Sequence, residues 1–423
     1  MLEIKLIREN PEIVKKDLQK RKEPEKLKWL EDLIKIDKES LKLKKDIDNL
    51  RHSRNTISQK INQLKKQGKS ADSEIKQAKE IPTKLESLEN KQKQLQEKIH
   101  YYLMRLPNIS HSSVPYGKDE NENKIVRKWG KLPKFNFNLK SHGEIIESLY
   151  PKSFKKGAEV SGRGFYYLID KIALLDRALV NFAIDFMLKK KYELMYHPYV
   201  LNKKAYEGAT DVNKFKDTLY KIEHEDLYLN ATAEHPLEAF FSNTTFKEKE
   251  LPKKVVGFAV SFRKEIGSHG IDERGLHRVH QFNKVEQFIV CKPEDSWKIH
   301  EELLKNAEEL IKKLKLPYRI VNACTGDLPT TTAKMYDIEV YMPREKKYKE
   351  VGSTSNCTSY QAVRSNIKYI SKKGKDYVHT LNSTAIATSR VLRAILENYQ
   401  TKEGYIKVPT VLQKYMHGLK VIK

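Results

Sequence analysis

The spacing of apolar residues divides the chain into two parts with different patterns. Between about residues 26 and 106, apolar residues recur at alternating intervals of four and three, from Leu43 to Leu64 and again from Ala78 to Leu106. This seven-residue period is typical of helices that pack along one seam. Gly68 lies between the two runs. We therefore predict a long antiparallel helical hairpin at about 26–106, with arms of roughly 55–60 Å at 1.5 Å per residue.

Two prolines affect the helices of this N-terminal part. Asn10 followed by Pro11 is a typical helix start, because proline fits the first turn, where its missing N–H is not needed. Pro82 falls inside the second heptad run. There it should kink the helix or mark a delayed helix start.

After residue 141 the pattern becomes that of a globular domain with both strands and helices. Alternating runs predict strands at 164–170, 192–198, 257–265, 278–288 and 334–341, and a polar passage at 350–361 that begins as a strand. Amphipathic runs predict helices at 172–190, at 297–313 on the surface, and through Arg390, Arg393 and Glu397. Residues 379–384 lead into the last predicted helix. Residues 107–138 are rich in Pro, Ser, Asn and Gly. We predict an α+β chain with an N-terminal domain at 1–108, a linker at 109–140 and a second domain at 141–423.

The net charge bears on the interpretation of the hairpin. The chain has 423 residues with 81 Lys or Arg and 56 Asp or Glu, a formal charge of +25. This excess indicates a polyanionic partner such as nucleic acid, with a lysine-rich composition and no partner as the alternative. Residues 27–66 contain 11 Lys or Arg and 6 Asp or Glu. The spacing leaves open whether the hairpin is a dimerising coil with a solvated face or a lever that binds a phosphate backbone.

The cysteines and the apolar runs indicate a cytoplasmic protein. Cys291, Cys324 and Cys357 stand 33 residues apart without a C-x-x-C pair, so we expect reduced thiols rather than disulfides or a zinc site. No apolar run approaches the roughly 18 residues that a membrane span needs, and the N-terminal residues lack the apolar block of a signal peptide.

The stretch from Lys254 to Phe288 combines charge with strand patterning. Two alternating runs flank a connection at 266–277 with three glycines, as in a long hairpin. Period-two alternation puts charged and aromatic side chains together on one face of the sheet: Arg263, Glu265, Arg278, Phe282 and Glu286. From spacing alone, a solvated face with cross-strand ion pairs and a binding site remain equally open. Three nearby histidines, His269, His277 and His280, lack the spacing of a zinc site.

The order of these residues resembles a known family. Phe262-Arg263-Lys264-Glu265, a connection, and then Arg278-x-x-x-Phe282-x-x-x-Glu286 resemble the second signature motif of class II aminoacyl-tRNA synthetases, and residues 278–286 resemble the seryl branch in particular. The helix and strand that end at Pro198 are similar to the first motif, and the region from His379 through Arg390 to the third. The resemblance implies an antiparallel β-sheet domain flanked by helices, a homodimer with its interface at the first motif, and a hairpin that contacts tRNA(Ser).

The resemblance also implies a reaction and its residues. L-serine and ATP would form seryl-adenylate with release of pyrophosphate, and serine would pass to the 3′ end of tRNA(Ser), with tRNA(Sec) left open. Arg263, Arg390 and Glu350 would be catalytic. The implied ATP contacts are Arg263, Lys264, Glu265, Arg274, Arg278, Val279, Phe282, Glu350, Val351, Gly352, Ser353 and Arg390. The implied serine contacts are Thr232, Ala233, Glu234, Arg263, Glu286, Asn382 and Thr384. Glu350 and Ser353 would bind Mg²⁺ with ATP, because hard cations prefer oxygen.

Departures and alternatives accompany this resemblance. Many members of the family have glycines around the third motif, whereas this chain has small residues, Ser383, Ala385, Thr388 and Ser389. A P-loop and a G-x-G-x-x-G fingerprint are missing from the sequence, so side chains on a sheet would have to hold ATP. One alternative is a relative that charges a carrier protein, which should lack the hairpin. Another is a coiled-coil scaffold with an inactive domain, which has no physical reason to keep converging charges.

Overall fold

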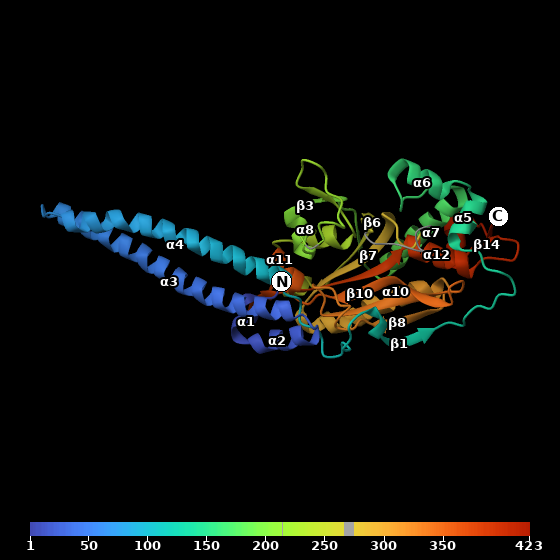
Figure 1. Cartoon of the computed structure of the whole chain (residues 1–423), viewed down its shortest axis with the longest axis horizontal. Helices are drawn as coiled ribbons and strands as arrows, with labels where there is room; N and C mark the ends of the chain where they lie inside the picture. Colours follow the sequence, from blue (N-terminus) through green and yellow to red (C-terminus); the bar gives the residue numbers. More distant parts are fainter. Residues whose placement is uncertain (214, 266–274) are drawn as a thin grey trace. The chain divides into compact units, whose positions relative to one another are not determined.

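The computed structural model describes residues 1–213, 215–265 and 275–423 (Figure 1). Arg274 and His269, which the sequence analysis singled out, therefore lie outside the described residues. The chain separates into two compact units, Leu2–Leu106 and Pro107–Lys423. None of the described helices combines the length and the apolar content that a membrane crossing requires.

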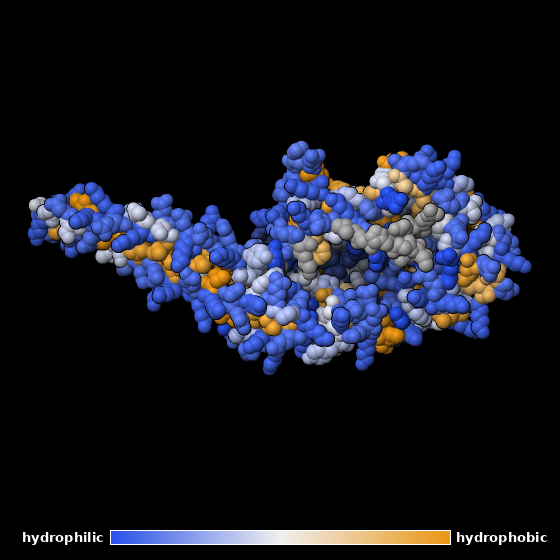
Figure 2. Space-filling model, viewed as in Figure 1, coloured by the Kyte–Doolittle hydropathy of each residue, from blue (hydrophilic) through white to orange (hydrophobic). Residues whose placement is uncertain are grey.

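The N-terminal unit contains the predicted helical hairpin. Its helices are α1 (Ile4–Glu9), α2 (Pro11–Lys20), α3 (Pro24–Lys66) and α4 (Asp72–Arg105). Between α3 and α4 the apolar side chains of the heptad pattern form the seam, with Leu43, Ile47, Ile81, Leu85 and Leu95 buried. The remaining surface of the hairpin is mostly hydrophilic, as Figure 2 shows. A heptad stripe is narrow, so only the side chains of this seam are buried from solvent. The predicted hairpin fold is confirmed.

Two details of this unit differ from the sequence analysis. Helix α1 was not predicted. Helix α4 begins at Asp72, ten residues before Pro82, and continues through it, so the alternative of a delayed helix start was wrong. Pro82 lies on the exposed side of α4. Packing along the seam stabilises α4 on both sides of the proline, which offsets a local cost of about 3 kcal/mol.

The C-terminal unit is built on an eight-stranded sheet. Its strands lie in the order β1-β8-β9-β10-β13-β7-β6-β2, and every neighbouring pair is antiparallel except β2 and β6. The strand bounds are β1 Lys124–Trp129, β8 Tyr318–Asn322, β9 Lys334–Met342, β10 Lys347–Asn356, β13 His379–Ala387, β7 Gln281–Cys291, β6 Lys253–Phe262 and β2 Glu193–Met195. The predicted antiparallel sheet domain is thus confirmed.

Helices cover this sheet and carry the largest core. That core joins apolar side chains of α7 (Asp170–Lys189), α10 (Ser296–Lys313) and α12 (Thr388–Asn398) to β7, β9 and β13. Helix α10 was predicted on the surface, but Leu303 and Leu310 on one of its faces are fully buried. A second cluster joins α9 (Glu234–Phe240) to β6 and β7. The other helices are α5 His142–Leu149, α6 Ser153–Ser161, α8 Lys203–Ala209, α11 Tyr360–Ser365 and α13 Thr410–Gln413.

Small sheets complete this unit. β12 (Gly374–Tyr377), β11 (Lys368–Ser371) and β5 (Thr245–Lys247) form one of them. Two-stranded sheets pair β3 (Val200–Asn202) with β4 (Leu227–Leu229), and β14 (Ile406–Lys407) with β15 (Val421–Ile422).

Three segments differ from their predicted form. Residues 164–170 form no strand, and the stretch predicted at 192–198 is a strand only over Glu193–Met195. Part of the predicted linker at 109–140 is strand β1, which pairs with β8 at the edge of the sheet. All six residues of β1 are exposed, so the apolar alternation that reveals a half-buried strand is missing there.

Candidate active site

A cleft lies over the middle of the sheet. Five segments line it: the ends of β6 and β7, strands β10 and β13, and the first turn of α12. Its lining residues are Arg263, Glu265, His277, Val279, Phe282, Lys284, Glu350, Val351, Gly352, Ser353, Thr384, Ala387, Ser389 and Arg390. These segments span more than 120 residues of sequence, and the strand order β10-β13-β7-β6 brings them side by side.

The pairing of β6 with β7 sets one side of the cleft. The antiparallel register ends at Phe262 opposite Gln281, and one further bond runs from the Arg263 N–H to the His280 carbonyl at 3.0 Å. The His280 N–H instead donates to the Gly164 carbonyl, also at 3.0 Å. Because this bond draws the chain away from β6, β7 begins at Gln281 rather than at the predicted residue 278. Arg278 consequently precedes the strand and is exposed.

Arg263 and Arg390 direct two positive charges toward the cleft. The Arg263 Nε donates to the Ala231 carbonyl at 3.0 Å, and its guanidinium lies 5.3 Å from the centre of the Phe282 ring. Burial lowers the pKa of Arg263, and the nearby Arg390 lowers it further. Arg390 is paired with Glu350 at 3.0 Å, and this carboxylate raises the pKa of Arg390. Two guanidiniums that repel one another form a site where a bound phosphate or carboxylate would be stabilised.

Glu350 and Ser353 form the side of the cleft on β10. Burial tends to raise the pKa of Glu350, but the charge and hydrogen bond of Arg390 together with the charges of Arg263 and His277 outweigh burial, so the pKa lies below its ordinary value. A bulge between Glu350 and Gly352 shifts the register of β10 against β9. Gly352 lies so close to Thr384 that an added Cβ would be 2.9 Å from the threonine Cβ. A side chain here would push β10 away from β13, so glycine keeps this wall of the cleft in place.

The oxygen donors of this wall fit a magnesium ion that is bound together with phosphates. Glu350 offers a carboxylate and Ser353 a hydroxyl, and the buried Asp337 is the cross-strand partner of Ser353. Burial and the neighbouring Glu350 raise the pKa of Asp337 well above its ordinary value. Within the described residues, no group of three or more His, Cys, Asp or Glu could hold a metal. Mg²⁺ commonly takes one or two carboxylates and completes its shell with phosphate oxygens and water.

A lysine joins a carboxylate and a hydroxyl group beside the cleft. Lys284 lies between Phe282 and Glu286 on the same face of β7. Its Nζ lies 2.7 Å from a Glu286 carboxylate oxygen and donates to the Thr232 hydroxyl at 3.1 Å. Thr384 faces Glu286 across the β7–β13 pair, and its hydroxyl bonds to that carboxylate. Lys284 thus connects Thr232 to Glu286 beside the cleft.

Glu234, at the start of α9, is a second carboxyl in this region and is partly buried. Burial and the nearby Glu286 raise the pKa of Glu234 to about 7. The Gln361 amide donates to Glu234 at 2.8 Å, and the Thr380 hydroxyl in turn donates to Gln361 at 2.6 Å, which fixes the carboxyl group in orientation. Burial also raises the pKa of Glu286, an effect that Lys284 opposes. One lysine therefore faces the buried Glu286 and the partly buried Glu234, and the ammonium group of a ligand would be stabilised in these surroundings.

The structure does not bring every predicted residue to the lining of the cleft: Thr232, Glu234 and Glu286 lie beside it, around Lys284. In the part of the chain that is described, Lys264 turns toward the Tyr220 ring, 5.3 Å away, and Arg278 is exposed outside the lining. Ala233 packs in the apolar core of α9. Asn382 is buried on β13 near the Cys357 sulfur, 3.9 Å from its amide.

Four lining residues were not assigned a role from the sequence: Lys284, His277, Ala387 and Ser389. The signal for Lys284 was present, because period-two alternation places it between Phe282 and Glu286. The other three line the cleft because distant segments meet there, which no local pattern in the sequence indicates.

Comparison with known proteins agrees with this geometry. Residues 215–399 match the model of the tRNA synthetase class II core domain (G, H, P, S and T), and residues 1–110 match that of the seryl-tRNA synthetase N-terminal domain. A serine–tRNA ligase of Methanocella arvoryzae is 50% identical over 425 residues, which cover 100% of both chains. A second, from Pyrococcus horikoshii, is 47% identical over 98% of this chain and 96% of its own length.

Solved structures agree over the whole length. The crystal structure of seryl-tRNA synthetase from Pyrococcus horikoshii complexed with ATP has a TM-score of 0.93 and 46% identity, covering 100% of this chain and 99% of that one. The cytoplasmic serine–tRNA ligase of Naegleria fowleri in complex with AMP has a TM-score of 0.87 and 35% identity, with the same coverage. The chain therefore belongs to the seryl-tRNA synthetase family, whose reaction is the two-step attachment of serine to tRNA.

Proposed function

We propose that the cleft binds ATP and L-serine side by side and forms seryl-adenylate with release of pyrophosphate. The observation that carries this proposal is the arrangement of charge. Arg263, Arg390 and the Phe282 ring line the cleft, and the carboxyl groups of Glu286 and Glu234 lie beside it, next to the lining residue Lys284. The first set suits a triphosphate and an adenine ring, and the second suits a small amino acid. The relatives from Pyrococcus horikoshii and Naegleria fowleri, which were crystallised with ATP and AMP, support the nucleotide assignment.

Adenylate formation needs positioning and charge compensation more than proton transfer. The serine carboxylate is ionised at neutral pH, so it attacks the α-phosphorus without a general base and pyrophosphate leaves in line. Arg263 would contact both the α-phosphate and the attacking carboxylate, and Arg390 the γ-phosphate or the adenine face opposite Phe282. Glu265 would contact the adenine amino group. Mg²⁺ held by Glu350 and Ser353 would neutralise part of the triphosphate charge.

The acidic side of the cleft would recognise serine. Glu234 and Thr232 would meet the substrate ammonium, and Glu286 with Thr384 the hydroxyl. Alanine would leave these buried polar groups unpaired, which is a strong basis for rejection. Threonine adds one methyl group, which a closely packed wall rejects by only about 1–3 kcal/mol.

The hairpin of α3 and α4 would bind tRNA(Ser). Its support is the match of residues 1–110 to the seryl-tRNA synthetase N-terminal domain, together with the surplus of cations on α3. Phosphate contacts by exposed Lys and Arg give such a surface affinity that falls as salt rises. Charging of tRNA(Sec) belongs to the same proposal and is tested with that tRNA as substrate.

The chain would act as a homodimer in the cytoplasm, where tRNA is charged. Support for a second copy comes from the region of α7 and β2, where large apolar side chains are exposed: Leu188, Leu194 and Tyr196. β2 is also an edge strand of the main sheet, and uncovered apolar edges are commonly interfaces. Sedimentation analysis should give twice the chain mass, and Leu194→Arg should shift the protein toward the monomer.

A shortened hairpin separates the two steps of the reaction. Deleting residues 52–65 and 72–85 removes two heptads from each helix and keeps the turn between them. We expect serine-dependent exchange of pyrophosphate into ATP to stay within about twofold of the full chain, and tRNA(Ser) charging to fall at least about a hundredfold. Exchange without charging by the full chain would contradict the tRNA assignment. Absence of serine-dependent exchange would contradict the adenylate assignment.

A further inference from the structure

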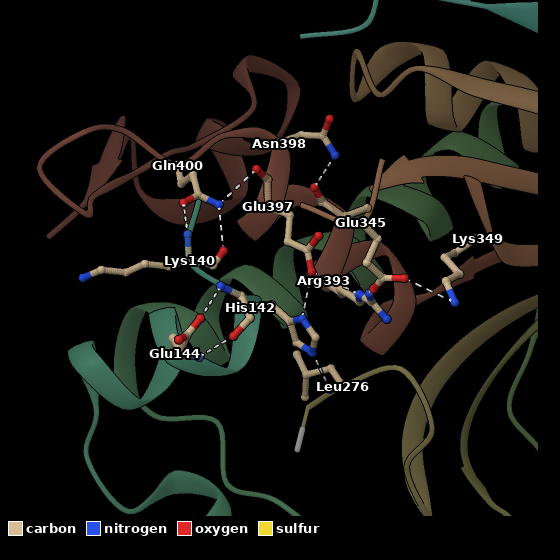
Figure 3. A network of polar contacts seen from close by, with 12 residues as sticks. Lys140, His142, Glu144, Leu276, Glu345, Lys349, Arg393, Glu397, Asn398 and Gln400 are labelled. Atoms are coloured by element: carbon tan, nitrogen blue, oxygen red, sulfur yellow. Dashed lines mark hydrogen bonds and ion pairs between the residues drawn. The ribbon is translucent and has the colours of Figure 1, made fainter. Parts of the chain in front are cut away.

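A buried polar network lies beside the cleft and centres on His142 (Figure 3). His142 is the first residue of α5, and its side chain is buried. Its Nδ1 lies 3.0 Å from a Glu397 carboxylate oxygen, and its Nε2 accepts the Leu276 N–H at 3.0 Å. Leu276 is 134 positions away in sequence, in the connection that leads into β7. One imidazole therefore bridges α5, α12 and this connection.

The geometry determines the proton on the ring. Because the Leu276 N–H donates to Nε2, that nitrogen keeps its lone pair and the proton resides on Nδ1. Nδ1 then donates to Glu397, whose same oxygen accepts from Arg393 Nε at 3.2 Å. Arg393 also pairs with Glu345, which Lys349 contacts at 3.3 Å. The charges of Arg393 and Lys349 thus neutralise those of Glu397 and Glu345, which is consistent with a neutral imidazole.

The position of His142 is fixed from both sides. Ser141 and Glu144 form a capping box at the start of α5, with bonds of 3.1 and 2.7 Å. Just before it, the Gln400 side chain holds both backbone groups of Lys140, at 2.9 and 3.1 Å. With its backbone held in this way, the ring can fix a partner in place rather than follow it.

The contact with the connection leaves no spare room. A Cβ added to Gly275 would lie 2.1 Å from His142 Nε2, and the three nearest atoms all belong to this ring. Gly275 is thus required here by His142. Leu276 is fully buried, and the residues that follow it, His277 and Val279, line the cleft.

The same network reaches the cleft from the other side. Arg393 lies one turn after Arg390 on α12, and Arg390 lines the cleft. The imidazole therefore ties the helix that presents Arg390 to the segment that presents His277 and Val279. Thr232, Glu234 and Glu286, the acidic side of the cleft, take no part in these bonds.

We propose that His142 is a positioning residue for nucleotide binding: by holding the Leu276 N–H against α12, it sets the nucleotide side of the cleft without touching the substrates. The inference rests on the proposed function of the cleft. Loss of the His142 contact should therefore weaken ATP binding without weakening serine binding. A purely structural role would affect both.

Two near-isosteric substitutions test the bond to Leu276. The amide oxygen of His142→Gln can reach the position of Nε2 and accept the N–H, whereas the shorter amide of His142→Asn reaches only Glu397. We expect the KM for ATP in pyrophosphate exchange to rise about tenfold in His142→Asn and to stay within about threefold in His142→Gln. The KM for serine should change less than about twofold in both. Equal effects of the two variants on ATP, or a parallel rise for serine, would overturn the proposal.

Gly275→Ala gives an independent test through the same contact. The added methyl group collides with the imidazole, so this variant should also raise the KM for ATP about tenfold. Combining it with His142→Asn removes the colliding ring atoms, and the double variant should be no worse than His142→Asn alone. Additive losses in the double variant would show that the contact does not set the nucleotide side.

A matched control and the unsubstituted chain separate the possible failures. His379 is partly buried, with Nδ1 2.9 Å from the Ser296 hydroxyl, and it does not line the described cleft. His379→Gln should leave the KM for ATP unchanged, and an equal rise there would overturn a specific role for His142. If the unsubstituted chain shows no serine-dependent exchange, the proposed function itself fails. If it shows exchange while His142→Asn keeps its KM for ATP, only this inference fails.

Discussion

Charged residues have different environments in the hairpin and in the cleft. On the hairpin, Arg51 and Glu89 form an ion pair at 2.8 Å with side chains 53% and 46% exposed. In the cleft, Lys284 and Glu286 pair at 2.7 Å with side chains 11% and 1% exposed. Similar distances therefore have different consequences, since water screens the first pair and is excluded from the second.

This difference determines how each region can work. An exposed ion pair contributes about 0–1 kcal/mol to stability. Charges on the hairpin can therefore be replaced one by one, and their effects add. Removing one partner of a buried pair costs about 3–5 kcal/mol, because the other charge stays unpaired out of water. In the cleft, the stability of every charge therefore depends on its neighbours. Many independent exposed charges suit the binding of a long polyanion. Interdependent buried charges suit the discrimination of one small molecule.

The largest difference should appear when an arginine is removed from each region. Arg263→Ala should lower the rate of serine-dependent pyrophosphate exchange on the order of 10³-fold, because the charge that meets the developing phosphate charge is lost. Arg51→Ala, the matched hairpin variant, should leave exchange within about twofold. Circular dichroism checks that both variants are folded. Near-normal exchange in Arg263→Ala would remove this residue from the mechanism.

The next effect concerns the buried lysine. Lys284→Met leaves Glu234 and Glu286 without their cation, so we expect the KM for serine to rise about a hundredfold and the free energy of unfolding to fall by about 3 kcal/mol. Denaturant unfolding measures the second quantity. Arg51→Met should change it by less than about 1 kcal/mol.

A double variant tests whether Lys284 acts through its partner. Lys284→Met with Glu286→Gln removes the unpaired charge, so most of the lost stability should return. If the double variant is as unstable as Lys284→Met, the loss comes from packing rather than from charge.

A smaller effect is expected from pH, and only on the serine side. The raised pKa of Glu234, about 7, means that its carboxylate form prevails only above that pH. As pH falls below about 7, protonation removes the charge that in the proposed function meets the serine ammonium, and kcat/KM for serine should drop up to about tenfold per pH unit. Glu234→Gln should abolish this dependence. A profile for serine that stays flat between pH 6 and 8 would contradict the role of Glu234.

The smallest effect is expected from a single cation of the hairpin. Arg54 is exposed on α3. Arg54→Ala should raise the KM for tRNA(Ser) by about two- to threefold and lower the slope of log affinity against log salt by about one or less. Exchange of pyrophosphate should not change. A loss of tRNA(Ser) charging as large as the loss of exchange in Arg263→Ala would mean that the charges of the hairpin also depend on one another.

Local periodicity explains how much of the structure was predictable from the sequence. The heptads predicted the seam of α3 and α4, since helical packing repeats within a few residues of the same segment. Alternation on β7 placed Phe282 and Glu286 on one face, and the ordered string around Arg263 indicated the family. In each case the information lies in neighbours along the chain, so it can be read from the letters alone.

The remaining features depended on which distant segments meet. Edge strand β1 has no apolar alternation, and the start of β7 depends on the bond between His280 and Gly164. The pKa of Glu234 reflects burial beside Glu286, 52 positions away. The bridge from His142 to Leu276 spans 134 positions. A period in the sequence specifies which face a side chain takes, whereas its partners across the sheet and its distance from water exist only once long-range packing has formed.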